Sequence, residues 1–203
     1  MDTICYEYGG NLYVNLTNRC DCACTFCLRN NGARGSIYAD DLWLEREPTR
    51  EEILDALKQR EPEGYPELVF CGFGEPTYRI DDIFWVIDQL KPKLPPVRIN
   101  TNGHANLICG RDVTPELAGR VDTLSISLNA STCQEYLALT RPQAGEAAWE
   151  AMLDFTRRAA TYVPKVVMTV VDKGDKSPAE IEACRALCAR LGATLRVRSY
   201  ISK

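Results

Sequence analysis

The chain has 203 residues, of which 45% are hydrophobic and 26% charged, enough for one compact domain with a sizeable core. Lys and Arg total 24 against 28 Asp and Glu, and the resulting net charge of −4 argues against a general nucleic-acid binder, which carries a basic surface. Because neither a membrane-spanning apolar run nor a signal-peptide pattern is present, we expect a single cytoplasmic domain over residues 1–203.

Six apolar, β-branched runs alternate with segments of helical pattern along the chain. The predicted strands are Leu12 to Thr17, Leu68 to Cys71, Val97 to Asn100, Thr123 to Leu128, Lys165 to Val171 and Thr194 to Ser199. Predicted helix starts are the capping boxes Thr49-x-x-Glu52, Ser131-x-x-Gln134 and Ser177-x-x-Glu180, with a short helix at Thr114-Pro115. Tyr6 to Val14, turning at Gly9-Gly10, is typical of a small hairpin before the first of these strands.

The alternation of strands and helices predicts an α/β fold with parallel strands and right-handed connections. Six such units give an open, partial TIM-like (β/α)6 barrel. The loop from Leu28 to Pro48 is unusually long for a compact domain, and loops of that length are often functional. The sequence ends just after the sixth strand, so we expect no C-terminal extension that could hold a second cofactor.

Ten cysteines in a reducing compartment predict thiol chemistry at some positions rather than a disulfide scaffold. Three of them, Cys20, Cys24 and Cys27, have the spacing Cys-x3-Cys-x2-Cys, with Phe26 before the last, and follow the first predicted barrel strand. Such a loop offers three thiolates to one iron-sulfur cluster and leaves the fourth iron without a protein ligand.

This motif resembles that of the radical S-adenosylmethionine (SAM) superfamily, in which it follows the first barrel strand and SAM chelates the open iron. The resemblance implies a [4Fe-4S] cluster on Cys20, Cys24 and Cys27, with Phe26 beside the bound cofactor. It also implies that the partial barrel is the radical SAM core.

Polar motifs follow the next two strands, where parallel α/β sheets place their ligands. Gly72-Phe73-Gly74-Glu75-Pro76 resembles the GGEP motif of the superfamily, which implies that Gly72, Gly74 and Glu75 receive the SAM amino group. Asn100 to His104 is similar to a Thr-Asn-Gly stretch of small glycyl-radical activating enzymes. Asn100 and Asn102 would supply side-chain amides at the barrel mouth.

Ser125, Ser127 and Asn129 share one face of the fourth predicted barrel strand by the period-two rule. Polar side chains on an inner face need partners, and the resemblance makes Ser127 and Asn129 candidates for the SAM ribose and carboxylate. Arg141 is either a counter-charge for that carboxylate or an ordinary surface arginine. The apolar strand from Val166 to Val171 is either a wall against the adenine or simply core.

The remaining thiols and the one histidine have other interpretations. Cys184 and Cys188 lie on the apolar stripe of a helix, which favours core packing over ligation. Cys22 and Cys71 are candidates for thiols next to the cluster or competing for it. His104 is the only histidine, which excludes sites needing several imidazoles and favours a hydrogen-bonded structural role over contact with a substrate.

The resemblance implies an enzyme that receives one electron from a donor such as flavodoxin or ferredoxin and cleaves SAM to a 5'-deoxyadenosyl radical. That radical abstracts hydrogen from a substrate that the motifs do not identify. A wide barrel mouth suits a large substrate such as a peptide or protein. Among small members, the chain resembles the glycyl-radical enzyme activases and, in the Asn-Arg-Cys-Asp-Cys setting of its cysteines, more closely the TatD-associated radical SAM proteins.

Two alternatives from other classes remain open at this point. A non-catalytic iron-sulfur electron carrier or redox sensor needs the cysteines but not the polar motifs at the strand ends. A structural zinc module would combine the three cysteines with Cys22 or Cys71.

Overall fold

The computed structural model describes residues 2–29 and 41–200, and its framework is one seven-stranded sheet in the order β1-β2-β3-β4-β5-β6-β7. The β1 strand is antiparallel to β2, and every later pair is parallel. The strands are β1 (Cys5–Tyr8), β2 (Asn11–Val14), β3 (Leu68–Phe70), β4 (Val97–Thr101), β5 (Thr123–Ser127), β6 (Lys165–Asp172) and β7 (Thr194–Ser199). The predicted α/β fold with six parallel strands is therefore confirmed.

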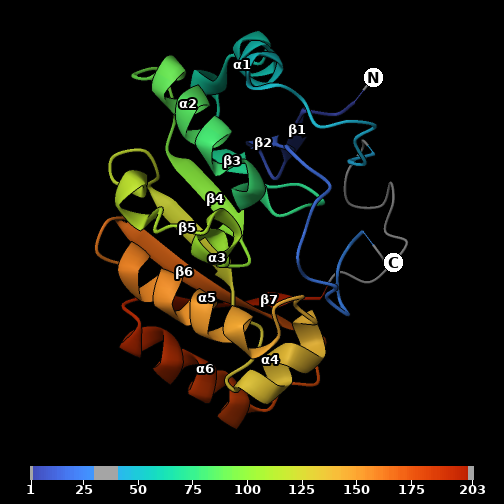
Figure 1. Ribbon diagram of the computed structural model, residues 1–203, viewed down its shortest axis with the longest axis vertical. Coiled ribbons are helices and arrows are strands. Elements are labelled where there is room, and N and C mark those ends of the chain that lie inside the picture. Colours follow the sequence, from blue (N-terminus) through green and yellow to red (C-terminus); the bar gives the residue numbers. More distant parts are fainter. Residues whose placement is uncertain (1, 30–40, 201–203) are drawn as a thin grey trace.

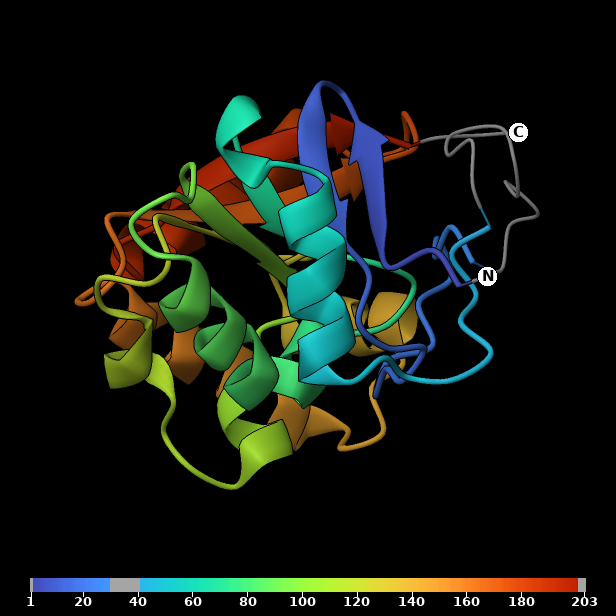
Figure 2. The same cartoon turned by 90° about the horizontal axis from the view of Figure 1, so that it is seen from above.

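Helices follow the parallel strands and lie on one side of the sheet (Figures 1 and 2). They are α1 (Arg50–Gln59), α2 (Ile80–Leu90), α3 (Ala105–Cys109), α4 (Cys133–Thr140), α5 (Glu146–Ala159) and α6 (Pro178–Arg190), with short 3-10 helices η1 (Pro62–Gly64), η2 (Pro76–Arg79) and η3 (Thr114–Leu117). No helix among the described residues is both long enough and apolar enough to cross a bilayer.

The two faces of the sheet differ in chemistry because successive side chains of a strand point to opposite sides. On the helix-covered face, Val14 pairs in register with Phe70, Phe70 with Ile99, and Ile99 with Leu124. These side chains belong to the main hydrophobic core. On the opposite, inner face the register joins Asn100 to Ser125 and Ser127 to Thr169. The inner face therefore carries polar side chains on β4 to β6, beside a smaller hydrophobic cluster that includes Tyr13 and Val69.

The predicted hairpin is present, and its second strand is the first strand of the barrel. Tyr6 pairs with Tyr13 across the turn, and Gly9 and Gly10 both have positive φ, which glycine adopts at little cost. The strand predicted to reach Thr17 ends at Val14, because its partner β3 ends at Phe70. Residues 15–17 instead lead into the cysteine loop.

Two of the three predicted capping boxes are confirmed, at Thr49–Glu52 and Ser177–Glu180. The third prediction was wrong by one residue: Thr132, not Ser131, accepts the hydrogen bond from the backbone NH of Glu135. Thr132 has the extended backbone of an N-cap. Thr114-Pro115 begins the 3-10 helix η3, which confirms the short helix predicted there. Residues 30–40 of the predicted long loop lie outside the described residues.

The buried thiols of Cys184 and Cys188 confirm the core interpretation of the last helix. Both are 1% exposed and belong to the main hydrophobic core, together with Leu187 of the same helix. They lie on the helix-covered side, so they do not face the polar end of the barrel.

Candidate iron-sulfur and SAM site

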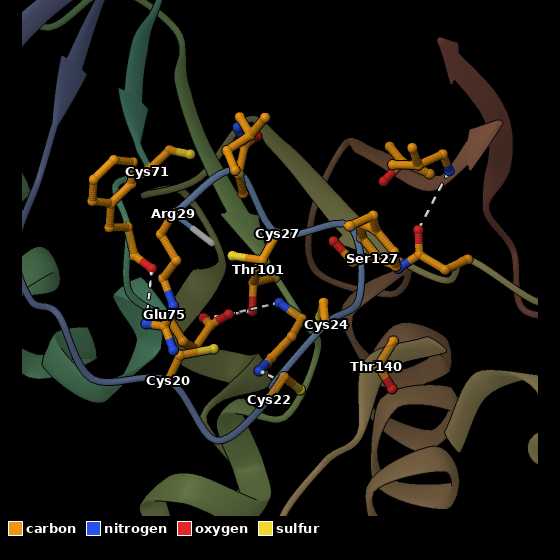
Figure 3. Close-up of a pocket in the computed structure, with 18 of the residues that line it drawn as sticks. Cys20, Cys22, Cys24, Cys27, Arg29, Cys71, Glu75, Thr101, Ser127 and Thr140 are labelled. Atoms are coloured by element: carbon orange, nitrogen blue, oxygen red, sulfur yellow. Dashed lines mark hydrogen bonds between the residues drawn. The ribbon is translucent and has the colours of Figure 1, made fainter. Parts of the chain in front are cut away.

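One cavity of about 260 Å³ opens at the carboxyl ends of the parallel strands. It is lined from one side by the cysteine loop and from the other by residues that follow β3 to β7 (Figure 3). The predicted site residues that line it are Cys20, Cys24, Phe26, Cys27, Gly72, Gly74, Glu75, Asn100, Asn102, Ser127 and Asn129. Residues far apart in the sequence thus meet where the fold places a ligand.

Backbone hydrogen bonds fix the cysteine loop to the end of α4 and to the turn after it. The NH of Ala23 donates to the carbonyl of Thr140 at 3.0 Å, and the NH of Thr25 donates to that of Leu139 at 2.9 Å. On the other side, the NH of Gln143 donates to the carbonyl of Asp21 at 2.8 Å. The loop therefore has a defined backbone path, and its thiols do not depend on the cluster alone for their placement.

The thiols of this loop differ in their surroundings. Hydrogen bonding with the thiol of Cys22 is the main cause that lowers the pKa of Cys24, and burial raises the pKa of Cys27. The same hydrogen bonds, first from Cys20 and then from Cys24, raise the pKa of Cys22. The thiols of Cys22 and Cys24 thus interact directly within the loop.

Cys22 is turned towards the loop after β4. Its Sγ atom lies 3.6 Å from the Nδ2 atom of Asn102 and 4.0 Å from the Nδ1 atom of His104, and the residue is 6% exposed. Cys71, at the end of β3, lines the cavity from the side opposite the cysteine loop. Burial raises the pKa of the Cys71 thiol.

The glycine-rich turn after β3 packs backbone to backbone against the chain that leads into the cysteine loop. A Cβ atom on Gly74 would lie 2.2 Å from the carbonyl oxygen of Thr17 and 2.6 Å from that of Arg19. A Cβ atom on Gly72 would meet the side chain of Asn15 at 2.0 Å. These glycines are therefore required by the contact between two loops, independently of any ligand.

Glu75 is 3% exposed, and its carboxylate accepts hydrogen bonds from two other segments. The Oε1 atom accepts from the backbone NH and hydroxyl of Thr77, at 3.0 and 2.7 Å, and from the hydroxyl of Thr101 at 2.8 Å. The Oε2 atom accepts from the NH of Asn102 at 2.6 Å. Burial raises the pKa of Glu75, although these hydrogen bonds oppose that shift. Glu75 thus joins the glycine turn to the loop after β4.

A buried chain of hydrogen bonds runs from the cysteine loop through His104 to α4. The Oδ2 atom of Asp21 lies 2.6 Å from His104 Nδ1, and His104 Nε2 lies 2.7 Å from the hydroxyl of Tyr136. Asn102 donates from Nδ2 to the Oδ1 atom of Asp21 at 2.6 Å. His104 is fully buried. The structural interpretation of His104 is supported, and Asp21 is the residue of the loop that sequence reasoning missed.

Asn129 carries an unused hydrogen-bond donor at the cavity. The residue is 2% exposed, and its Nδ2 atom has no partner among the described residues, whereas its Oδ1 atom accepts from the NH of Val171 at 3.4 Å. An orphaned buried donor costs roughly 1–3 kcal/mol. A ligand that presents oxygen atoms, as the carboxylate and ribose of SAM do, would satisfy it.

Arg141 is the predicted site residue that does not line the cavity. It is exposed and ends α4 with a left-handed backbone (φ 47°). Its backbone carbonyl accepts a hydrogen bond from the NH of Ala23 at 3.3 Å. Its contact with the cysteine loop is made by the main chain, and the carboxylate role of its side chain stays a prediction.

The tightest group of possible ligands for a single ion among the described residues is Cys20, Asp21 and Cys22. The carboxylate of Asp21 is already taken by His104 and Asn102. Thiolates of a four-iron cluster bind separate irons, so they need not converge as ligands of one zinc ion do. A cluster with SAM fits this site better than zinc does. The site has three thiols in one loop, an unpaired donor at Asn129 and a cavity between them.

The structure adds cavity-lining residues that no sequence motif indicated. Tyr8, Tyr13, Thr169, Arg198 and Tyr200 all face this space. The period-two rule could have found Thr169, because Thr169 lies on the same face of its strand as Val167 and Val171. Tyr8 comes from the antiparallel strand that precedes the barrel, so only the folded hairpin brings it to the site.

The fold and the site define a partial parallel barrel with a thiol-rich cofactor cavity at its carboxyl end. A family model described as the Radical SAM superfamily matches residues 14–183, so the chain belongs to the radical SAM superfamily. Proteins of this superfamily use a [4Fe-4S] cluster and SAM, which agrees with the cofactors implied by the sequence.

Curated relatives support the same assignment. The chain is 31% identical over 159 residues to molybdenum cofactor biosynthesis protein 1 of Drosophila melanogaster, covering 76% of this chain and 26% of the relative. It is 26% identical over 188 residues to a probable GTP 3',8-cyclase of Thermococcus kodakarensis, covering 92% of this chain and 55% of the relative. The chain thus spans about a quarter to a half of these two proteins.

Solved structures show the same fold at low sequence identity. Streptococcus suis SuiB bound to the precursor peptide SuiA superposes with a TM-score of 0.68 at 15% identity, over 93% of this chain and 39% of SuiB. The finer resemblance to TatD-associated proteins stays a prediction, as does the single-domain assignment of residues 1–203.

Proposed function

We propose that this protein is a radical SAM enzyme that cleaves SAM reductively at a [4Fe-4S] cluster held by Cys20, Cys24 and Cys27. The observation that carries the proposal is the shared cavity: the three thiols line the same space as Asn102, Ser127 and Asn129 at the strand ends. Cys20, Cys24 and Cys27 would hold the cluster, which would supply the electron for reductive cleavage of SAM and so the 5'-deoxyadenosyl radical that abstracts hydrogen from the substrate.

The residues of the chain have distinct tasks in this proposal. The hydrogen bonds of Ala23 and Thr25 to the end of α4 hold the thiol loop in place, and Glu75 holds the glycine turn against the loop after β4. Asn129 offers its free Nδ2 donor to an oxygen of SAM, with Ser127 beside it in the cavity. A rigid frame limits stray reactions of a radical, because it fixes which hydrogen lies near the reactive carbon.

The partners of the reaction belong to the same proposal. A one-electron donor such as flavodoxin or ferredoxin reduces the cluster, and the reduced thiols required fit a cytoplasmic enzyme. We favour a peptide or protein substrate, supported by the SuiB structure, which is bound to a precursor peptide. The GTP 3',8-cyclases among the relatives make a nucleotide the competing substrate class.

The test is anaerobic reconstitution with iron and sulfide, followed by SAM and a strong reductant, with 5'-deoxyadenosine measured by mass spectrometry. Cys27→Ala should abolish 5'-deoxyadenosine and lower bound iron. The matched control is Cys184→Ala with Cys188→Ala, two buried thiols outside the cavity, which should leave iron content unchanged.

Each result of that test has a defined meaning. Retained cleavage in Cys27→Ala would contradict the ligand assignment, and loss of iron in the control would place ligands on α6. A fully loaded wild-type cluster that forms no 5'-deoxyadenosine would favour the electron-carrier alternative. A colourless protein that retains zinc would favour the structural module.

A further inference from the structure

The inner face of the sheet carries three arginines and a shortage of negative charge. Arg98 on β4 is neutralised: it forms an ion pair with Glu67 at 2.8 Å and donates to the side chain of Asn100 at 3.1 Å. The other two, Arg196 and Arg198, lie on β7, where they pair in register with Thr169 and Val171 of β6. Both of those β6 residues line the cavity, so the two arginines share the cavity's face of the sheet.

Neither arginine of β7 has an acidic partner among residues 2–29 and 41–200. The Nη2 atom of Arg196 donates to the hydroxyl of Ser125 at 3.3 Å, a neutral acceptor on the inner face of β5. Arg198 lines the cavity together with Cys27 and Asn129. The buried carboxylate nearest the cysteines, Glu75, is already occupied by Thr77, Thr101 and Asn102. It does not balance the charge of β7.

The arginines also repel one another. Burial lowers the pKa of Arg196, and the positive charges of Arg198 and Arg98 lower it further, whereas the charges of Tyr13 and Glu67 act in the opposite direction. Both arginines are exposed, so solvent weakens this repulsion, but two like charges on one strand face still favour an anion between them. A planar guanidinium binds a carboxylate or a phosphate through two parallel hydrogen bonds. The guanidinium groups of Arg196 and Arg198, two residues apart on one face of β7, therefore form a candidate anion-binding site.

We propose that Arg196 and Arg198 bind an anionic group of the substrate, a carboxylate or a phosphate, on the β7 side of the cavity. This inference rests on the proposed function, because the cavity is where SAM would be cleaved. The candidate SAM contacts come from the loops and strand ends of β3 to β5, whereas the arginines lie on the last strand of the sheet. A substrate anchored there by its charge would place the rest of the molecule between β7 and the cysteine loop.

The experiment uses the cluster-loaded protein with SAM present, under anaerobic conditions, and measures anion binding by isothermal titration calorimetry. Inorganic pyrophosphate represents a phosphorylated substrate, and glutarate represents a carboxylate. Arg196→Gln and Arg198→Gln are compared with wild type. The matched control is Arg190→Gln, which removes the same charge from an exposed position at the end of α6.

We expect each β7 variant to bind its preferred anion about tenfold more weakly, the effect of losing one charge-assisted hydrogen bond, with Arg190→Gln close to wild type. The anion that wild type binds more tightly identifies the source of the charge. Three results would overturn the proposal: no measurable binding of either anion, equal weakening in Arg190→Gln, or displacement of SAM by the anion. The last would mean that the arginines serve the carboxylate of SAM itself.

Failure of this site and failure of the proposed function have separate signatures. If wild type forms 5'-deoxyadenosine but the two β7 variants bind the anions as tightly as wild type does, the anion site alone is overturned. Arginine-dependent anion binding by a loaded protein that never cleaves SAM would leave the site in place and overturn the proposed function.

Discussion

Asp21 and His104 are joined by a contact of 2.6 Å between Oδ2 and Nδ1, although 83 residues separate them in the chain. Asp21 lies between two cysteines of the cysteine loop, and His104 lies at the end of the loop after β4. The contact is buried, with 0% of the histidine side chain and 9% of the aspartate side chain exposed. It fixes the thiol loop to the loop after β4.

Replacing His104 by Gln should therefore loosen the cysteine loop. Gln lacks the two ring nitrogens that face Asp21 and Tyr136. Removing one of the two side-chain partners of the Asp21 carboxylate, with Asn102 retained, costs about 1–3 kcal/mol. We expect the free energy of unfolding of the cluster-free protein to fall by that amount in urea, and the iron retained after reconstitution to fall as well. Tyr136→Phe is the companion variant, because it removes only the hydroxyl bound to Nε2. Equal losses in the two variants would show that the Asp21 contact contributes nothing.

The same pair predicts a dependence of stability on pH. Burial acts to raise the pKa of Asp21, but hydrogen bonds from His104 and Asn102 outweigh it, so the pKa lies below the ordinary 3.8. A carboxyl whose pKa is lower in the folded state adds stability that is complete above the unfolded value and is lost as the pH falls through the folded one. The difference in unfolding free energy between wild type and Asp21→Asn should thus be constant well above pH 3.8 and shrink as the pH falls below 3.8 towards the folded-state pKa. A difference that grows on acidification would refute the assignment.

Gly74→Ala should disrupt the site without touching any ligand. The added Cβ would meet the carbonyl oxygens of Thr17 and Arg19, which belong to the main chain and cannot move aside cheaply. Overpacking of this kind costs about 1–3 kcal/mol or more, measurable by urea unfolding of the cluster-free protein. Gly64→Ala is the matched control, since its added Cβ would meet nothing within 4 Å. If Gly74→Ala unfolds like wild type, the loop contact is not what requires glycine there.

Glu75→Gln separates a structural role from a role in binding SAM. An amide can keep one oxygen towards Thr77 and Thr101, but its NH2 group would then face the backbone NH of Asn102, placing two donors against each other. We expect the cluster-free variant to lose about 1–3 kcal/mol, whereas Glu182→Gln on the exposed face of α6 should lose little. Unchanged stability combined with weaker SAM binding in calorimetry would instead show that the carboxylate serves the SAM amino group.

The sequence predicted the framework of this site well because its signals are local. Apolar β-branched runs mark each parallel strand, and the residues just after them, such as Gly74 and Asn102, must reach the carboxyl edge of a parallel sheet. The spacing of Cys20, Cys24 and Cys27 and the face shared by Ser127 and Asn129 are equally local. All seven of these residues line one cavity.

The remaining features depend on contacts that the sequence does not encode at short range. Nothing in the local sequence distinguishes Asp21 from any other acidic residue in a loop, because its partner His104 is distant in the chain. Arg198 likewise looks like any exposed strand residue, and only the pairing of β7 with β6 places it next to Val171 and near Thr169. The wrong N-cap predicted at Ser131 has a local cause. Ser131 and Thr132 both have side chains suited to an N-cap, and it is Thr132 that has the extended backbone an N-cap requires.

The first and last strands of the sheet do not pair with each other: within the described residues, β1 pairs only with β2 and β7 only with β6. A closed barrel has a fixed circumference, because every strand pairs on both sides. An open sheet keeps two edges that do not pair with each other. Its curvature, and with it the spacing of the groups at the carboxyl end, can therefore change without breaking any strand pair.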